Sequence, residues 1–330
     1  MTRNRYYSGP PSDHFDGELF FSPTRPIDKT FRDVLSWRFN DRPLRWPASY
    51  PSPFVDRPPF RVQGGALRVS YIGHASFLIQ TRGLNLLVDP VFSKRVSPMS
   101  WAGPARVNPP GIPFDDLPPI DVVLVTHNHY DHLDLGTLSK LQTRWRPKIF
   151  TPLGNDTIMR RHERALTPQA HDWGARIELS PDVAVHFMPA YHWSARGLND
   201  RRMALWCAFL IETPDGPLYC IGDTGFGDGA IFRDIKEKFG APRLAFIPIG
   251  AYEPRWFMKD QHIDPAEAVE VFKLCGARRA IAHHWGTFPL SNEAIDAPPK
   301  ALAAALKRAE INEESFRVMR PGEVFEQAPD

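Results

Sequence analysis

The sequence predicts a layered α/β or α+β fold with mixed β-sheets. Short apolar runs at 67–72, 76–80 and 84–89 follow one another closely and indicate leading antiparallel strands. From residue 121 onward such runs alternate with helical patterns, which is typical of layered α/β proteins. The 330 residues, of which 42% are hydrophobic and 24% charged, suffice for a complete core, so we expect one or two globular domains.

The apolar runs and the turn residues that flank them predict the individual elements. The expected strands cover 67–72, 76–80, 84–89, 121–127, 148–152, 176–179, 183–188, 204–213, 217–223, 244–249 and 279–284. The expected helices begin near Leu133 and then cover 155–164, 228–239, 264–276 and 298–309. The helix at 264–276 has the clearest boundaries, because Asp264 can cap it, Pro265 suits the first turn and Gly276 can end it.

The N-terminal part of the chain is rich in proline and in aromatic residues. Of the 34 prolines, 18 lie in residues 1–119. A solvated linker normally contains few aromatic residues, whereas this part contains many. We therefore expect residues 1–65 to form an extended strap packed on a main domain at 66–330. A helical turn or two is expected near Asp28–Phe39.

Charge and cysteine content narrow the class of protein. The 40 Lys and Arg residues against 38 Asp and Glu leave a net charge of +2, which argues against nucleic acid as a partner. Cys207, Cys220 and Cys275 match no metal knuckle and no disulfide framework, which favours a reducing compartment. The first residues lack a secretory pattern, and no window approaches a membrane span. We expect a soluble, cytoplasmic protein that at most touches a membrane from one side.

A dense group of potential metal ligands follows the expected strand 121–127. His127 and His129 are two residues apart and can point the same way, and Asp131 and His132 follow where the chain turns towards a helix. Imidazole and carboxylate without thiolate suit zinc, iron or manganese. The alternative is a polar surface turn, because His, Asn and Asp all favour turns.

Further ligand candidates lie at the ends of other expected strands. They are His192, Asp223 and either His283 or His284. Sites of α/β sheets usually lie at the carboxyl ends of their strands, so this recurrence favours a shared site. Each candidate also has an alternative explanation, since Asp223 can start a turn and His192 can be a core histidine. Side-chain alternation along a strand predicts that only one of His283 and His284 faces the site.

These residues carry a resemblance to a known superfamily. The pattern HxHxDH at 127–132, followed by a later His, a Gly-Asp-Thr and a last His, resembles the ligand set of the metallo-β-lactamase superfamily. The resemblance implies a four-layered αβ/βα sandwich with two mixed β-sheets. The stretches YIGHASFLI (71–79), LLVDPVFSKRVSPMSWAGPAR (86–106) and GAYEPRWFMKDQHIDP (250–265) resemble, more narrowly, the N-acylphosphatidylethanolamine-hydrolysing phospholipase D family and its bacterial relatives.

The resemblance implies a site with two divalent ions, with Zn²⁺ favoured and Fe or Mn as alternatives. The resemblance implies that His127, His129 and His192 hold one ion. It implies that Asp131, His132 and His284 hold the other, and that Asp223 bridges the two. The family motif selects His284 rather than His283, which then has a structural role. Asp131 and His262 are the candidates for direct catalytic roles, with His262 binding a phosphate oxygen or protonating the leaving group, or serving only as a helix-entry residue.

Asp89 and His74 are near the ligand candidates in the expected fold, and the sequence allows two roles for each. Asp89 ends the expected strand 84–89 and can orient one of the ligand histidines, or it can simply start a turn before Pro90. His74 can approach the site, although a packed structural histidine is the favoured interpretation.

The implied activity is hydrolysis of a phosphodiester by a metal-bridging hydroxide. In the phospholipase D reading, N-acylphosphatidylethanolamine yields phosphatidic acid and an N-acylethanolamine. The alternatives are a hydrolase of soluble phosphodiesters or lactones on the same site, and a non-catalytic, metal-stabilised binding protein. Loop 91–114 mixes apolar and basic residues, so it either touches a membrane or packs as an ordinary loop. A homodimer is expected by resemblance only.

Overall fold

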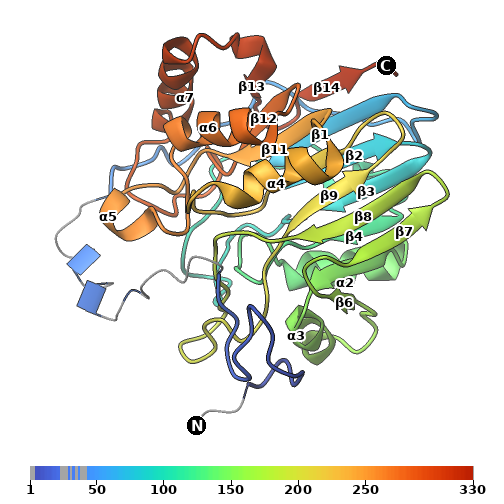
Figure 1. The fold of residues 1–330 in the computed structure, drawn as a ribbon, viewed down its shortest axis with the longest axis vertical. Coiled ribbons are helices and arrows are strands. Elements are labelled where there is room, and N and C mark those ends of the chain that lie inside the picture. Colours follow the sequence, from blue (N-terminus) through green and yellow to red (C-terminus); the bar gives the residue numbers. More distant parts are fainter. Residues whose placement is uncertain (1–3, 23–28, 30–31, 34–35, 38–42, 330) are drawn as a thin grey trace.

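A computed structural model describes residues 4–22, 29, 32–33, 36–37 and 43–329. Two seven-stranded sheets face each other (Figure 1). In spatial order, the first sheet contains β14 (Val324–Gln327), β1 (Leu67–Gly73), β2 (Ser76–Thr81), β3 (Leu84–Val88), β4 (Val122–Leu124), β5 (Lys148–Pro152) and β6 (Gln169–His171). The second contains β13 (Phe316–Val318), β12 (Ala280–His283), β11 (Leu244–Pro248), β10 (Leu218–Cys220), β9 (Ala208–Glu212), β8 (Val183–Met188) and β7 (Arg176–Ser180).

The two sheets follow the same plan. Strands β1, β2 and β3 pair antiparallel, whereas β3, β4, β5 and β6 pair parallel. In the second sheet β7, β8, β9 and β10 pair antiparallel, and β10, β11, β12 and β13 pair parallel. The parallel strands need crossover connections, and these contain the helices. The predicted mixed sheets are therefore confirmed.

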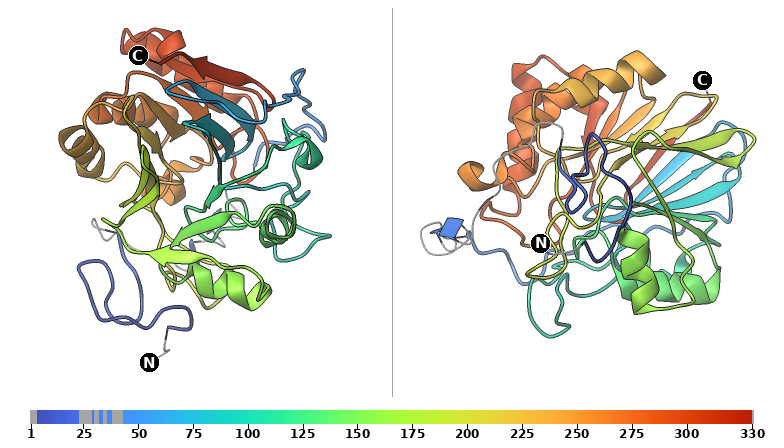
Figure 2. Two further views of the ribbon diagram at one scale, coloured as in Figure 1. Left: turned by 90° about the vertical axis from the view of Figure 1, so that its right-hand side faces the viewer. Right: turned by 60° about the horizontal axis from the view of Figure 1, so that its bottom comes forward.

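Helices cover both outer faces, which gives four layers. The helices are α2 (Leu135–Arg144), α3 (Asn155–His162), α4 (Ala230–Phe239), α5 (Arg255–Met258), α6 (Pro265–Cys275) and α7 (Ala297–Arg308). Helices α2 and α3 pack on the first sheet, and α4, α6 and α7 pack on the second (Figure 2). A further apolar cluster fills the space between the sheets. The predicted αβ/βα sandwich is therefore confirmed.

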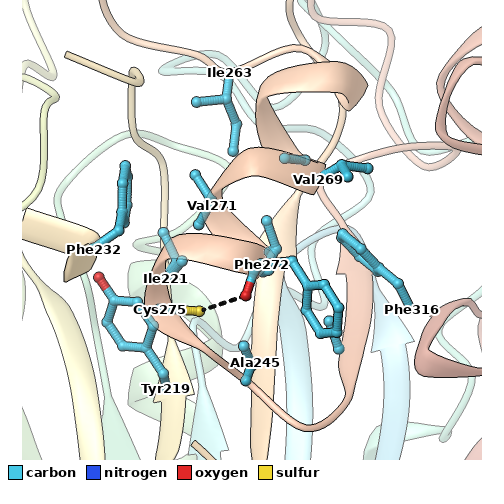
Figure 3. Packing of buried hydrophobic residues seen from close by; sticks show 14 of the residues in the cluster. Tyr219, Ile221, Phe232, Ala245, Ile263, Val269, Val271, Phe272, Cys275 and Phe316 are labelled. Atoms are coloured by element: carbon cyan, nitrogen blue, oxygen red, sulfur yellow. Dashed lines mark hydrogen bonds between the residues drawn. The ribbon is translucent and has the colours of Figure 1, made fainter. Parts of the chain in front are cut away.

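Figure 3 shows the core beneath α4 and α6. Phe232 of α4, Val271 of α6 and Tyr219 of β10 are all buried there. Helix α6 begins where the sequence predicts, because the Asp264 carboxylate accepts hydrogen bonds from the backbone N–H groups of Ala266 and Glu267. This cap fixes the loop that precedes α6, and that loop carries His262.

Most predicted elements agree with the structure, and the differences have physical causes. The apolar run 204–213 becomes a strand only from Ala208, because its first part packs against the N-terminal segment and bonds to loops. Strand β4 ends at Leu124, so His127 lies in the loop beyond it. The sequence missed β6, β13, β14 and α5, which are only three or four residues long.

The N-terminal segment 4–22 lies against the loops next to β8 and β9. Phe15 and Phe20 are buried with Leu205 and Trp206 in a small apolar cluster. The helix expected near Asp28–Phe39 falls mostly outside the described residues, although 32–33 and 36–37 have helical geometry. The division into a strap at 1–65 and a domain at 66–330 stays a prediction.

Two further expectations concern the cysteines and membrane spans. All three cysteines are buried and none forms a disulfide bond. Within the described part of the chain, no helix combines the length and the apolar character that crossing a membrane requires.

Candidate metal centre

The strand ends that carry the ligand candidates meet at one edge of the sandwich. Strands β3 and β4 are parallel neighbours, so Asp89 and His127 follow them at the same edge. In the second sheet β10, β11 and β12 are parallel, which places Asp223 and His284 together. His192 follows β8, which runs in the same direction as β10 because both pair antiparallel with β9. The long connecting loops gather at this edge, on the left of the sheets in Figure 1.

The first cluster contains three histidines and one aspartate. His129 Nδ1 lies 2.9 Å from His127 Nε2 and 3.2 Å from His192 Nε2. The Oδ2 atom of Asp223 lies 3.7 Å from His127 Nε2 and 3.6 Å from His192 Nε2. One ligand atom from each residue therefore faces a common point, in a group whose ligand atoms all lie within 4.8 Å of one another.

The second cluster faces the other oxygen of the same aspartate. Asp223 Oδ1 lies 3.3 Å from His132 Nε2 and 3.0 Å from His284 Nε2. Asp131 Oδ2 lies 3.6 Å and 3.3 Å from the same two nitrogen atoms. The structure thus brings all seven residues predicted as ligands together, with Asp223 between the two clusters.

Contacts behind the first cluster fix the tautomers of two of its three histidines, His127 and His192. The Thr126 hydroxyl donates to Asp89 Oδ2, so it can only accept at its 3.0 Å contact with His127 Nδ1. His192 Nδ1 lies 2.9 Å from the carbonyl oxygen of Gln261, which also can only accept. Both rings therefore carry their proton on Nδ1 and direct the Nε2 lone pair into the cluster, which is the metal-binding form.

Asp89 supports the second cluster in the same way. Its Oδ2 atom lies 2.7 Å from His132 Nδ1, and its Oδ1 atom accepts from the backbone N–H of Thr126 at 2.7 Å. The sequence allows Asp89 either to start a turn or to orient a ligand histidine, and in the structure its carboxylate contacts His132. Its φ of 41° is strained for a non-glycine residue, and such strain is concentrated at functional sites.

Buried polar atoms of the second cluster lack a hydrogen-bond partner of good geometry. Among the described residues, the Nε2 atoms of His132 and His284 and the Oδ1 atom of Asp223 have none. An unpaired buried polar group destabilises a protein unless something else satisfies it. Nitrogen and carboxylate oxygen atoms that converge in this way fit a divalent cation.

The electrostatics favour the ligand forms of most of these groups. Burial lowers the pKa of His192 to about 3 and that of His129 to about 4, so both rings are neutral. Burial raises the pKa of Asp223, but His284, His132 and His262 outweigh it and hold that pKa well below its usual range. The carboxylate therefore stays ionised.

His132 and His284 differ from the other histidines. Burial lowers the pKa of each, but nearby carboxylates outweigh it: Asp223, Asp131 and Asp89 around His132, and Asp223 and Asp131 around His284. The net result is a raised pKa for His132 and a pKa of about 9 for His284. In the metal-free chain, protons on these rings balance the carboxylate charge that a bound cation would otherwise neutralise.

His74 lies next to the second cluster, which the sequence allowed but did not favour. The sequence favours a packed structural histidine, whereas in the structure His74 Nε2 lies 2.9 Å from Asp131 Oδ2. The cause is topological, because β1 runs in the same direction as β3 and ends at the same edge. His74 also adopts a φ of 60°, which departs from the extended strand conformation immediately after Gly73.

The two remaining candidates differ in their distance from the clusters. His262 Nδ1 lies 4.0 Å from Asp223 Oδ2, and burial lowers the pKa of His262 to about 3. His262 is therefore a neutral group beside the first cluster, and it stays a candidate for a direct role. His283 belongs to none of the ligand groups found among the described residues, and its ring packs 5.8 Å from that of Phe77.

Sequence reasoning missed two supporting groups. The hydroxyl of Thr126 lies next to His127 in the sequence, so its position in the motif offered a signal. The carbonyl of Gln261 carried no signal, because every residue has a carbonyl and only the fold determines where it points.

Comparisons with known proteins agree with this geometry. A family model described as the β-lactamase superfamily domain matches residues 84–285. N-acyl-phosphatidylethanolamine-hydrolyzing phospholipase D 1 of Caenorhabditis elegans is 38% identical over 271 residues, which cover 79% of this chain and 76% of the worm protein. The mitochondrial N-acyl-phosphatidylethanolamine-hydrolyzing phospholipase D of Saccharomyces cerevisiae is 33% identical over 238 residues, covering 71% of this chain and 50% of the yeast protein.

A solved structure shares the fold. Igni18, a metallo hydrolase from the archaeon Ignicoccus hospitalis, superimposes with a TM-score of 0.59 at 21% identity, covering 80% of this chain and 99% of Igni18. At that identity the match concerns the fold only, whereas the worm relative and the family model concern the family. The chain therefore belongs to the metallo-β-lactamase superfamily, in the family of the N-acylphosphatidylethanolamine-hydrolysing phospholipases D.

Proposed function

We propose that this metal-dependent hydrolase cleaves the phosphodiester of N-acylphosphatidylethanolamine-like lipids and releases phosphatidic acid and an N-acylethanolamine. The observation that carries the proposal is Asp223, whose two carboxylate oxygens face two separate clusters. Such an arrangement suits two neighbouring cations, and two-metal sites of this kind include many that act on phosphate esters. The 38% identity to the worm enzyme supports the choice of substrate.

In this proposal, different residues of the chain bind the ions and contact the substrate. The two ions would be held by His127, His129 and His192, and by Asp131, His132 and His284, with Asp223 within reach of both. Bound divalent ions supply Lewis acidity towards phosphoryl oxygens and lower the pKa of water. The imidazole and carboxylate donors suit Zn²⁺, with Fe or Mn as alternatives. His262, a neutral imidazole beside Asp223, donates a hydrogen bond to the phosphate or to the leaving oxygen.

The proposal also includes contact with a lipid surface. A cavity of about 580 Å³ lies between loop 93–100 and Arg196, and its lining includes Lys94 and Arg95. Two apolar side chains of loop 91–114 reach into solvent, since Met99 is 44% and Trp101 76% exposed. Basic groups next to exposed apolar tips suit a bilayer with anionic headgroups.

Lipid hydrolysis by the metal-loaded full chain tests the proposed substrate. The protein is offered N-acylphosphatidylethanolamine in mixed micelles, bis-p-nitrophenyl phosphate and a panel of lactones. We expect release of N-acylethanolamine, and its loss in Asp131→Asn and His284→Ala. His186→Ala is the matched control, because His186 pairs with Glu212 outside the site. Turnover of only the soluble esters or lactones would contradict the lipid substrate, and no turnover with both ions bound would favour a binding protein.

Vesicle binding tests the lipid contact without any turnover. We expect the protein to sediment with vesicles of phosphatidylglycerol and phosphatidylcholine, but weakly with pure phosphatidylcholine. Lys94→Gln with Arg95→Gln removes two basic groups, each worth about 1 kcal/mol at such a surface. Lys307→Gln with Arg308→Gln, at the end of α7, removes the same two charges elsewhere and serves as the control. Equal loss of binding in both double variants would contradict a specific lipid face at loop 93–100.

A further inference from the structure

We infer that the N-terminal segment 4–22 and Arg196 form a brace that positions the loops carrying the metal ligands. The brace joins three parts of the chain that are far apart in sequence: segment 4–22, loop 193–203 and the ligand loop 125–134. Loop 193–203 and the ligand loop contain no helix and no strand. Residues 130–132 of the ligand loop form a turn. Outside helices and strands, buried backbone groups often find their hydrogen-bond partners in side chains.

Arg196 connects two positions of the ligand loop, one before and one after residues 129–132. Its Nη1 atom donates to the carbonyl oxygen of Asn128 at 2.8 Å and to that of Leu133 at 2.9 Å. Asn128 stands between His127 and His129, and Leu133 follows His132. The guanidinium carbon lies 3.9 Å from the centre of the Tyr130 ring, and the Tyr130 hydroxyl donates back to the Arg196 carbonyl at 3.0 Å. A single side chain therefore contacts the ligand loop on both sides of residues 129–132.

The N-terminal segment in turn holds Arg196. Asp200 Oδ1 accepts from the backbone N–H groups of Arg196 at 3.1 Å and Gly197 at 2.8 Å. The other oxygen, Oδ2, accepts from the Tyr6 hydroxyl at 2.8 Å. Burial, together with the contact to Asp200, raises the pKa of Tyr6 to about 12, so the hydroxyl keeps its proton and donates. The path from Tyr6 to the ligand loop passes through two side chains only.

A second contact connects the segment directly to a ligand residue. The Ser22 hydroxyl donates to the backbone carbonyl of His192 at 3.0 Å, in a buried position. Between these two polar contacts, Phe15 and Phe20 bury their rings against Leu205, which fixes the segment to the chain that follows loop 193–203. In Figure 2 (right) the dark blue N-terminal trace runs beside the yellow-green loop.

The brace lies partly outside the domain that the family model describes. That match begins at residue 84, so Tyr6 and Ser22 lie outside the matched residues. Groups that orient metal ligands from behind typically change metal affinity 10- to 100-fold when they are removed. We therefore expect segment 4–22 to control how tightly this chain retains its ions.

Metal release from the full-length, metal-loaded protein tests the brace. Tyr6→Phe removes only the hydroxyl that reaches Asp200, and Tyr7→Phe is its matched control. The Tyr7 hydroxyl makes no hydrogen bond with the described residues, and its ring keeps its packing against Phe15 in the variant. Ser22→Ala removes the contact with His192. The readouts are the rate at which a chelator removes Zn²⁺, the visible spectrum of the Co²⁺-substituted protein, and the unfolding temperature.

The expected results rank the variants. Tyr6→Phe and Ser22→Ala each release metal about 5-fold faster, as the loss of one hydrogen bond predicts, while Tyr7→Phe behaves like the unmodified chain. Arg196→Met weakens metal binding about 10- to 100-fold and changes the Co²⁺ spectrum. Arg196→Lys recovers part of the loss, because an ammonium group can still donate to a carbonyl.

Two results would overturn the brace. One is unchanged metal release and an unchanged Co²⁺ spectrum in Tyr6→Phe, Ser22→Ala and Arg196→Met. The other is a lower unfolding temperature in these variants with metal affinity unchanged, since the segment would then only stabilise the fold. If Arg196→Met does not fold, Tyr6→Phe and Ser22→Ala still test whether the segment affects metal binding. None of these measurements depends on the substrate, so they stand apart from the lipid assay.

Discussion

His74 Nε2 lies 2.9 Å from Asp131 Oδ2, at a point where both side chains are buried. Oδ2 is also the Asp131 oxygen that faces His284 and His132, so the contact orients the carboxylate towards the second cluster. The His74 backbone contributes as well, because its carbonyl oxygen accepts from the backbone N–H of His284 at 2.9 Å. One residue thus holds two ligand candidates of the same cluster.

His74→Leu should therefore weaken metal binding at the second cluster while His74→Gln preserves much of it. Leucine removes the donor to Asp131, whereas the Gln side-chain amide can reach a position similar to Nε2. We expect a loss of about 10- to 100-fold in affinity for His74→Leu. Zinc titration by calorimetry, followed as two binding steps, measures it. Equal affinities of the two variants and the unmodified chain would rule out this role for His74.

Asp223→Asn should reduce the metal content further than the loss of a histidine from one cluster. The amide has a single ligating oxygen, so it cannot serve both clusters at once. We expect at most one ion per chain in Asp223→Asn, and one retained ion in His192→Ala, which leaves the second cluster intact. Elemental analysis after dialysis gives the count. Two tightly held ions in Asp223→Asn would contradict the bridging position of this residue.

His262→Ala should keep both ions and lose turnover. His262 lies 4.0 Å from Asp223 Oδ2 and is a candidate for contact with substrate rather than a ligand of either cluster in our proposal. Removing one donor to a transferring phosphoryl group typically lowers kcat about 10²-fold or more. Turnover and metal content are measured on the same preparation. Full activity would remove His262 from the mechanism, and loss of an ion would make it a ligand.

The attachment of segment 4–22 should weaken as pH rises. His14 Nε2 lies 2.7 Å from Asp172 and Nδ1 lies 2.6 Å from Asp13. Burial lowers the pKa of His14, but hydrogen bonds to Asp172 and Asp13 outweigh it and raise the pKa above 6.5. The protonated ring therefore stabilises the folded state fully below the unfolded pKa of about 6.5, and this stabilisation is lost as pH rises through the folded pKa.

Limited proteolysis or hydrogen exchange of residues 4–22 between pH 6 and pH 9 measures this effect. We expect protection to fall with rising pH in the unmodified chain. In His14→Gln protection should be lower at pH 6 and almost independent of pH. Protection that stays constant with pH in the unmodified chain would contradict the role of His14. Rapid cutting throughout residues 10–60 at pH 6 would contradict the expected packed strap.

Sequence patterns predicted much of the fold because the relevant signals are local. Helix α6 begins and ends within one residue of its prediction, since the Asp264 cap and Gly276 act within a single turn. Strand β5 was predicted with its observed bounds, 148–152. The short strands β13 and β14 were missed, because their few residues are strands only through pairing with β12 and β1.

The same division applies to the site. The sequence by itself determined the ligand candidates, because HxHxDH concentrates four donors within six residues and the others follow strand ends. The tertiary structure decided the roles of Asp89, His74 and Arg196, whose partners lie 43, 57 and more than 60 residues away. Such contacts depend on strand order and on where backbone carbonyls point. Neither is encoded in the spacing of side chains along the chain.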